Sequence, residues 1–267
     1  MSPGTARGNA VPSPHCVLIT GATGGIGTAL ALEYAAVGRT LLLHGRNPDR
    51  LADLASRCTQ RGATVAQIAI DLADAREAAG RLRESCGEYP IELAIVNAGV
   101  SHISGANGES WEDIERVLQV NLNAAIATVS AVVPGMRERG RGQIALMSSL
   151  AAYFGLPLTP AYCASKAALK AYGESLRGGL ASQGVAVNVV LPGFVNTAMS
   201  DRFPSAKPFM ILPDRAARRI RHGLERNRAR IAFPIPMSWG AWWLSVLPSE
   251  ISEKLVQLGG YGVRRGK

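Results

Sequence analysis

Tyr162 and Lys166 form the pair of residues in this sequence best suited to acid–base chemistry. A separation of four places both side chains on one face of a helix, which we expect over 160–182. A free tyrosine has a pKa of about 10, too high for efficient proton transfer at neutral pH, and a neighbouring ammonium group lowers that pKa by stabilising the phenolate. The pair therefore predicts a tyrosine acid or base, although the same spacing also arises by chance in surface helices.

Two more polar residues are expected close to this pair. Ser149 follows the predicted strand 143–147, at the mouth of the sheet where Tyr162 should also lie, and its hydroxyl is suited to hydrogen-bond a substrate oxygen. Asn121 stands within the apolar run 117–122, where a buried amide needs a partner such as a water molecule or a backbone carbonyl. For Asn121 alone, an ordinary core asparagine is the alternative.

A glycine-rich turn follows the predicted strand 16–20 and opens the predicted helix 25–37. Glycines let the backbone approach a pyrophosphate, and the N–H groups at a helix N-terminus stabilise its charge. The spacing departs from the usual G-x-G-x-x-G pattern, and a purely structural turn is the alternative. The residues that we assign to this phosphate loop are Thr20, Gly21, Thr23, Gly24, Gly25, Ile26 and Gly27.

The choice between NAD(H) and NADP(H) depends on the residue after the second strand, predicted at 40–43. Arg46 stands there in place of the usual carboxylate, and its planar guanidinium can hold a 2′-phosphate, so we predict NADP(H); a solvated loop charge is the alternative. Beyond the third strand, predicted at 64–70, Asp71 and Leu72 are placed to contact the adenine. Asp71 could equally cap the next helix.

Short apolar runs alternate with longer segments of helical period along the chain. Such alternation predicts right-handed crossovers, hence a Rossmann-type α/β fold: a doubly wound parallel sheet with helices on both faces, in a single domain. The predicted strands are 16–20, 40–43, 64–70, 91–96, 143–147 and 185–191. The predicted helices are 25–37, 48–61, 74–86, 110–137, 160–182 and 214–228.

Ligands of such sheets bind beyond the carboxyl ends of the strands, so the loops there should carry the chemistry. The loop after 91–96 reads Asn97-Ala98-Gly99, whose small residues would let a ribose or the nicotinamide pass close to the backbone. A structural turn is the alternative for this tripeptide.

Together these motifs resemble those of the short-chain dehydrogenase/reductase family over roughly residues 15–200. The matching motifs are T-G-x-x-x-G-I-G at 20–27, N-A-G at 97–99, Asn121, Ser149, Y-x-x-x-K at 162–166 and P-G at 192–193. Their order and spacing make the resemblance specific, although each motif is modest alone.

The resemblance implies roles for the candidate catalytic residues. Tyr162 would be the general acid or base, Lys166 would bind the nicotinamide ribose and lower the tyrosine pKa, Ser149 would orient the carbonyl, and Asn121 would hold a water of the proton relay. The segment with Pro192, Gly193, Val195 and Thr197 is similar to the family's nicotinamide-contacting segment, with Thr197 near the phosphates.

The implied function is hydride transfer between NADPH and a carbonyl or alcohol substrate. The family's substrate choice resides in the segment after Pro192-Gly193, here a flap at 194–212, together with the C-terminal extension. Apolar residues in this flap suit a partly lipophilic substrate. The alternatives are a non-catalytic NADP(H)-sensing protein, an epimerase with a keto intermediate, or a 3-oxoacyl reductase, although the family's V-D-G-G-like C-terminal motif of such reductases does not occur here.

Composition limits the other function classes. A chain of 267 residues that is 47% hydrophobic can bury one large core. Residues 201–267 hold 13 Lys and Arg against 5 Asp and Glu, a difference of +8 within the total of +9, but no nucleic-acid-reading motif accompanies this charge. The four cysteines are far apart, which predicts neither a metal site nor disulfides and favours a cytoplasmic location.

The two ends of the chain differ from the catalytic domain, which we expect over 15–233. Residues 1–14 are small and polar and predict a disordered tail. In the extension 234–267, prolines limit the first helix to 237–247, too short to span a bilayer. With a following helix at 252–258, the segment could pack against another subunit of a homodimer or homotetramer, lie on a membrane surface through 237–258, or cover the core.

Overall fold

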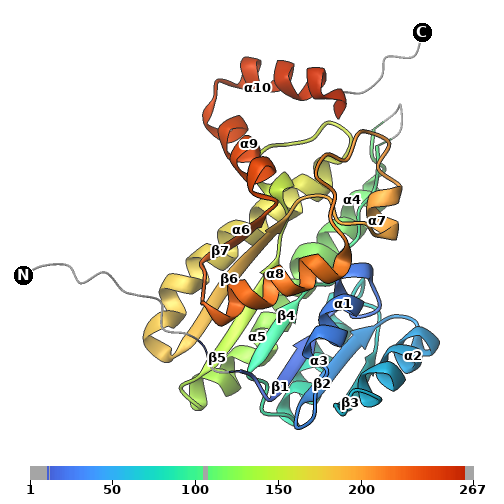
Figure 1. Cartoon of the computed structure of the whole chain (residues 1–267), viewed down its shortest axis with the longest axis vertical. Helices are drawn as coiled ribbons and strands as arrows, with labels where there is room; N and C mark the ends of the chain where they lie inside the picture. The colour runs from blue at the N-terminus through green and yellow to red at the C-terminus, as the bar shows by residue number, and fades with distance from the viewer. Residues whose placement is uncertain (1–10, 12, 105–107, 262–267) are drawn as a thin grey trace, which may run out of the picture.

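A single parallel sheet of seven strands organises the chain, as the computed structural model shows for residues 11, 13–104 and 108–261. The strand order is β3-β2-β1-β4-β5-β6-β7, and every neighbouring pair is parallel (Figure 1). The strands are β1 Cys16–Ile19, β2 Thr40–Gly45, β3 Thr64–Ala69, β4 Leu93–Val96, β5 Gly142–Met147, β6 Val185–Pro192 and β7 Arg230–Phe233. The predicted doubly wound α/β fold is confirmed.

Helices cover both faces of the sheet (Figure 1). Buried side chains of α1, α2 and α8 pack on one face, and those of α3, α5 and α6 pack on the other. The helices are α1 Gly25–Tyr34, α2 Pro48–Thr59, α3 Ala75–Gly87, α4 Trp111–Leu118, α5 Ala124–Glu138, α6 Pro160–Leu180, α7 Ala198–Asp201, α8 Pro213–Glu225, α9 Ile235–Val246 and α10 Ser249–Val256. Because both faces are covered, the central strands are apolar throughout, and all residues of β1 and β4 are buried.

The predicted helix 110–137 contains a π-helical segment that the sequence did not reveal. Residues Gln119–Asn123 separate α4 from α5, and Ala124 N–H donates to the carbonyl of Gln119, five residues earlier. The continuous helix Trp111–Glu138 is long and apolar enough to cross a membrane by length and composition, but its buried side chains pack on the sheet. Such π-helical turns often occur at functional sites, and this one carries Asn121.

Strand β7 was missed in the sequence because it is short and begins with the charged Arg230. It pairs with β6 and completes one edge of the sheet. Several predicted helices also end two or three residues too late; α1, for example, ends at Tyr34 rather than at 37. These ends carry no strong stop signal in the sequence.

The C-terminal helices α9 and α10 lie at one end of the molecule, above the sheet in Figure 1. Helix α9 begins two residues before the predicted 237, because a proline is tolerated in the first helical turn and Pro236 occupies that place. Helix α10 begins at Ser249 and is followed by a π-helical turn, Gln257–Tyr261. At the other end of the chain, residues 1–10 and 12 of the predicted tail lie outside the described residues, and the Val11 N–H donates to the Glu225 carbonyl.

Candidate active site

The phosphate loop between β1 and α1 is closed by contacts that only glycine permits. Gly21 has a φ of +63°, and a Cβ there would lie 2.7 Å from the Cα of Ala98. A Cβ on Gly27 would collide with the carbonyl oxygen of Gly21, and one on Gly25 would collide with the side chain of Thr197. The loop therefore packs backbone against backbone, which brings its N–H groups and the N-terminus of α1 to the cleft.

His44 at the end of β2 holds this loop in place. Its Nδ1 accepts from the Gly21 N–H at 3.1 Å, and its carbonyl accepts from the Ala22 N–H at 2.8 Å. The Nε2 lies 3.1 Å from the carbonyl of Ile70. Because Nδ1 accepts, Nε2 carries the hydrogen and the ring is neutral, which agrees with a pKa lowered by burial. The only sign of this role in the sequence is a polar residue near the end of an apolar strand.

The Asn97-Ala98-Gly99 loop after β4 is tied to the phosphate loop. Thr20 is fully buried, and its hydroxyl oxygen accepts from the N–H groups of Asn97 and Ala98 at 3.0 and 3.1 Å. The side-chain amide of Asn97 donates to the carbonyls of Thr20 and Gly21, each at 3.1 Å. These contacts make Thr20 and Asn97 braces behind the cleft, while Gly99 lies beside the functional ends of Asn121 and Lys166.

A cleft of about 310 Å³ runs along the carboxyl ends of the strands from Arg46 to Tyr162. It is lined by every residue predicted to bind the cofactor except Thr20, Gly193 and Val195. Arg50, which the sequence analysis missed, also lines it and donates to the Thr23 carbonyl at 2.9 Å. Its position in the first turn of α2, four residues after Arg46, is a pattern that could have indicated it.

Asp71 lies at the same end of the cleft and does not cap the next helix. Its Oδ1 accepts from the Ala73 N–H at 3.0 Å, a local turn just after β3. The residue at the start of α3 is instead Asp74, whose carboxylate accepts from the Glu77 N–H at 3.0 Å. The helix-cap alternative for Asp71 is therefore wrong, because α3 begins at Ala75, beyond the reach of Asp71 but directly after Asp74.

Tyr162 lines the cleft and is hydrogen-bonded to Ser149, which follows the end of β5 at Met147. The Ser149 hydroxyl oxygen accepts from the Ala151 N–H at 3.1 Å and lies 3.5 Å from the carbonyl of Pro192. Hydrogen bonding with Ser149 lowers the pKa of Tyr162, but desolvation by burial is the larger effect and raises it to about 12. The phenol is therefore protonated at neutral pH.

Lys166 is buried behind Tyr162, one turn further along α6. Its ammonium donates to the Met147 carbonyl at 2.8 Å and lies 5.6 Å from the centre of the Tyr162 ring. Burial lowers the pKa of Lys166 to about 8. The expected lowering of the tyrosine pKa by this cation is not found, because desolvation disfavours both charged forms and exceeds the attraction between them at this separation.

Asn121 clamps two other segments together through its carboxamide. Its Oδ1 accepts from the Val100 N–H at 2.8 Å, and its amide donates to the Val100 carbonyl at 2.9 Å and the Ser165 hydroxyl at 3.0 Å. Both amide hydrogens are thus used by protein atoms. The carboxamide of Asn121 therefore joins the π-helical segment to the loop after β4 and to α6.

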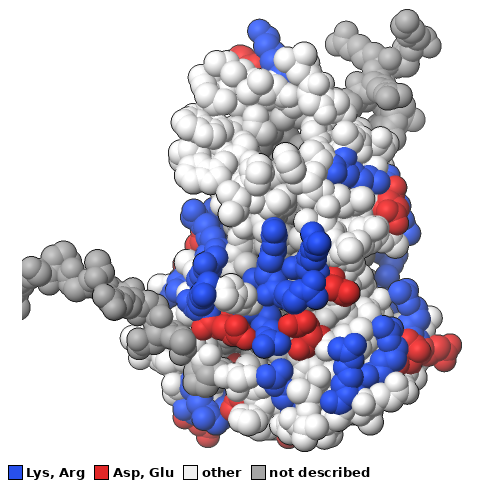
Figure 2. All heavy atoms as spheres, in the orientation of Figure 1, with Lys and Arg blue, Asp and Glu red and all other residues white. Residues whose placement is uncertain are grey.

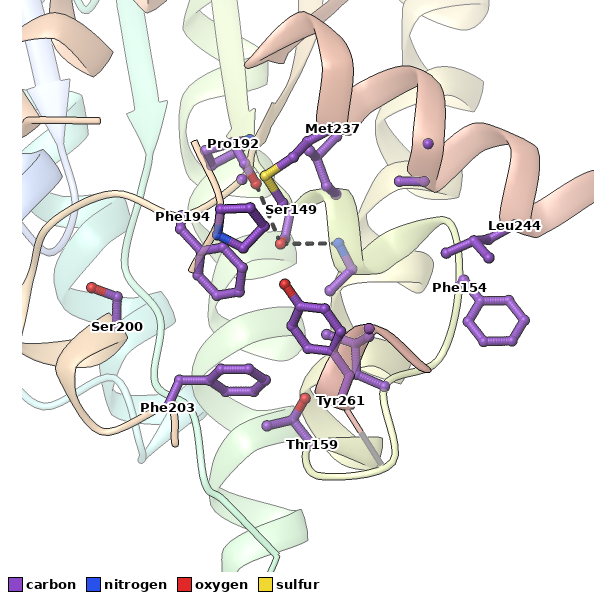
Figure 3. Close-up of a pocket in the computed structure, with 18 of the residues that line it drawn as sticks. Ser149, Phe154, Thr159, Pro192, Phe194, Ser200, Phe203, Met237, Leu244 and Tyr261 are labelled. Carbon is purple, nitrogen blue, oxygen red and sulfur yellow. Dashed lines mark hydrogen bonds between the residues drawn. The ribbon is translucent and has the colours of Figure 1, made fainter. Parts of the chain in front are cut away.

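A second, larger cavity of about 560 Å³ adjoins the cleft, and Tyr162 lines both. Its walls are mostly apolar. Figure 3 shows the hydroxyl of Ser149 pointing into the space that Phe194, Phe203, Tyr261 and Met237 surround. Gly193 and Val195, predicted to bind the cofactor, line this cavity instead of the cleft. The hydroxyls of Tyr162 and Ser149 therefore lie where the cleft meets the apolar cavity, which we call the chamber.

Part of the predicted flap 194–212 contributes to this chamber. Phe194, Met199, Phe203 and Pro208 line it, whereas Phe209 and Met210 do not and are exposed. The reason is the isolated bridge between Val195 and Ile211, which returns the end of the flap along its own start.

The C-terminal extension supplies the rest of the wall. Residues of α9, α10 and the turn after it line the chamber: Met237, Gly240, Ala241, Trp243, Leu244, Leu247, Leu255, Val256, Gly259 and Tyr261. Tyr261 stacks on Phe194 with ring centres 6.3 Å apart and donates its hydroxyl to the Ala206 carbonyl at 3.0 Å. The extension therefore closes the flap over the chamber, a role that composition alone did not distinguish from core covering.

Metal chemistry finds no support in the described part of the chain, which holds no group of three metal-ligating side chains. All four cysteines are buried as free thiols. Burial raises the pKa of Cys163, next to Tyr162, so this thiol is an unreactive packing residue.

Comparison with known proteins agrees with this geometry. Residues 15–208 match the family model of the short chain dehydrogenases. An uncharacterized oxidoreductase of Myxococcus xanthus is 34% identical over 240 residues, covering 90% of this chain and 95% of that protein. Human estradiol 17-beta-dehydrogenase 11 is 28% identical over 262 residues, covering 93% of this chain and 87% of its own length.

Among solved structures, a short-chain dehydrogenase of Sphingobium yanoikuyae in complex with NADPH superposes with a TM-score of 0.76. It is 27% identical, and the match covers 94% of this chain and 97% of that one. The chain belongs to the short-chain dehydrogenase family, and it is an oxidoreductase of the class that uses a nicotinamide dinucleotide.

Proposed function

We propose that this protein is an NADPH-dependent reductase of lipophilic ketones or aldehydes. The observation that carries the proposal is the position of Tyr162 and Ser149 at the junction of a glycine-lined cleft and an apolar chamber. Hydride transfer from a dinucleotide to an apolar carbonyl compound needs such a junction, because the two reactants must meet beside the hydroxyls that bind the carbonyl oxygen.

The residues of the cleft fit a phosphorylated dinucleotide. The pyrophosphate would lie against the N-terminus of α1, where Gly24 and Gly25 line the cleft. Arg46 and Arg50 line the adenosine end, where two guanidinium groups would attract the 2′-phosphate of NADP(H). Two solved relatives at 27% identity have NADP or NADPH bound, which supports the same choice.

The chemistry at the junction follows from the protonation states. A bound, reduced nicotinamide supplies the hydride. The hydroxyls of Ser149 and Tyr162 would hold the carbonyl oxygen, and Tyr162 would give its proton to the alkoxide that forms there. A tyrosine pKa of about 12 keeps that proton in place at neutral pH, as the acid of a reduction requires.

Lys166 would stabilise the phenolate that remains after the transfer. Its ammonium, now bonded to the Met147 carbonyl, lies close enough to the ring to attract that negative charge. The hydroxyls of a bound ribose would offer it further acceptors. Lys166 is thus proposed to bind the cofactor and to favour proton release from Tyr162 to the alkoxide.

Cofactor specificity is tested by kinetics with NADPH and NADH. We expect kcat/KM to favour NADPH, and we expect Arg46→Ala to lower that preference about tenfold, by the loss of one charge-assisted contact. The matched control is Arg57→Ala on α2, whose guanidinium pairs with Asp53 outside the cleft. A preference for NADH in the unmodified protein would contradict the assignment.

The substrate class is tested with a series of ketones of increasing apolar bulk. The chamber predicts that kcat/KM rises from small aliphatic ketones to aryl and long-chain ones, because each buried methylene adds about 0.8 kcal/mol. NADPH oxidation that is equally fast with every member, or absent with all of them, would argue against a lipophilic substrate.

A further inference from the structure

The outward side of the C-terminal helices is an exposed apolar surface. We call it the platform: Ile235, Trp239, Trp242, Val246, Ile251 and Leu258, all exposed. Trp239 is 60% exposed and Leu258 is 85% exposed, and none of the six lines the chamber. Large apolar side chains gathered in this way are typical of a surface that meets another apolar phase or a partner.

The distribution of charge around the platform favours contact with a membrane surface. The sequence from Ile231 to Ser249 holds no charged residue, and α10 adds Glu250, Glu253 and Lys254. Figure 2 shows the surface over α9 and α10 as mostly uncharged, with Lys and Arg gathered further down the same face, over α8.

The chamber adjoins the same two helices as the platform. Trp243 and Leu255 line the chamber and are 53% and 47% exposed, so solvent reaches its wall at these helices. A protein partner or a second copy bound over the platform would restrict access to the chamber at these residues. A fluid bilayer would leave it open, and it is also the phase in which lipophilic carbonyl compounds dissolve.

We propose that the platform docks on the surface of a phospholipid bilayer and that lipophilic substrates enter the chamber from the membrane. Helix α9 has 12 residues and is about 18 Å long, shorter than the hydrocarbon core of about 30 Å, so it lies in the interface and does not span it. Three tryptophans on α9 suit the headgroup level, where an indole ring keeps its N–H hydrated. The entry route rests on the proposed function, whereas the docking itself does not.

Flotation with vesicles tests the docking with the full-length protein. We expect it to float with phosphatidylcholine vesicles, and more strongly when phosphatidylglycerol is added. The double variant Trp239→Ser/Leu258→Ser should bind the vesicles at least about tenfold more weakly, because it loses two apolar anchors. Trp111→Ser is the matched control, since Trp111 is 68% exposed on α4, and it should float like the unmodified protein.

Three results would overturn the docking proposal. One is an unmodified protein that stays in the aqueous layer, and another is a double variant that floats equally well. The third is an oligomer that sediments intact without lipid but dissociates in the double variant, because that result would assign the platform to a subunit contact. We expect the sedimenting mass to be the same in both proteins.

Activity separates this proposal from the proposed function. With a small, water-soluble ketone, we expect the double variant to oxidise NADPH as fast as the unmodified protein, which also shows that it is folded. With an aryl ketone dissolved in the vesicles, we expect its turnover to fall about tenfold with the loss of binding. Flotation without any NADPH oxidation would refute the proposed function and leave docking supported; oxidation without flotation would refute docking alone.

Discussion

The cofactor cleft and the substrate chamber meet at Tyr162 but are lined by different kinds of residue. Glycines line the cleft in the loops that follow β1, β2 and β4, and the contacts of Gly21 and Gly27 leave no space for a side chain. The chamber is formed by large apolar side chains from the flap and the C-terminal helices. The comparison teaches that the cleft is rigid and intolerant of change, whereas the chamber can be reshaped by single truncations.

The largest effect is expected from adding one methyl group to the cleft. In Gly27→Ala, the new Cβ would strike the Gly21 carbonyl and the backbone of Ala22, so the phosphate loop must open. We expect NADPH to bind about a thousandfold more weakly, a loss of about 4 kcal/mol, measured by calorimetric titration.

The control for that variant is Gly80→Ala, on the exposed side of α3, where a Cβ would meet nothing within 4 Å. It should leave NADPH affinity unchanged and stabilise the fold by about 0.5–1 kcal/mol, because alanine is the better helix former. Tight NADPH binding by Gly27→Ala would show that the loop is not held as rigidly as the contacts suggest.

The next effect concerns stability at the junction. Burial of the Lys166 ammonium costs stability while the group is charged, so Lys166→Met should raise the free energy of unfolding of the cofactor-free protein by up to about 3 kcal/mol at neutral pH, with the loss of turnover. Thermal unfolding of both proteins, without cofactor, measures the difference.

The pH dependence of this difference has a definite sign. The pKa of Lys166 is lowered from 10.5 to about 8 in the folded protein, so the unfolded chain binds more protons between these values. The stability of the unmodified protein should therefore rise from pH 8 to pH 10.5, relative to Lys166→Met, and the gap should close. A gap that is constant over this range would mean that Lys166 is not buried as a charged group.

The smallest effect is expected in the chamber. Tyr261→Ala removes a stacked ring from Phe194 and a hydrogen bond to Ala206, together about 1–2 kcal/mol. We expect KM for an aryl ketone to rise about tenfold, with NADPH affinity unchanged. Tyr261→Phe keeps the ring and should show only the part of the rise in KM that is due to the hydrogen bond. Weaker NADPH binding in either variant would contradict the separation of the chamber from the cleft.

The same division explains what the sequence could predict. The cleft depends on local motifs, strand, turn and helix in succession, so most of the predicted residues that line it came from such motifs, although the family resemblance supplied Pro192 and Thr197, and Arg50 was missed. His44 was missed because its role is a contact with Gly21 and Ile70 across two strands, which leaves only a polar residue in an apolar strand as its signal.

The chamber could not be predicted in the same way. Its wall joins Phe194 to Tyr261 across a long stretch of sequence, and an apolar helix such as α9 gives the same pattern whether it faces a substrate, a subunit or a lipid. Strand β7 was missed for a related reason, since four residues at the edge of a sheet carry too little pattern to be recognised. The direction of the Tyr162 pKa shift needed the burial that only the fold reveals.

The central claim, that Tyr162 donates the proton at the junction of the two cavities, is tested most directly by Tyr162→Phe. Turnover of an aryl ketone with NADPH and the dissociation constant of NADPH would be measured on the same preparation. We predict turnover about 10²–10⁴-fold slower with NADPH affinity within about twofold of the unmodified protein. Turnover close to that of the unmodified protein, with NADPH still bound, would contradict the account.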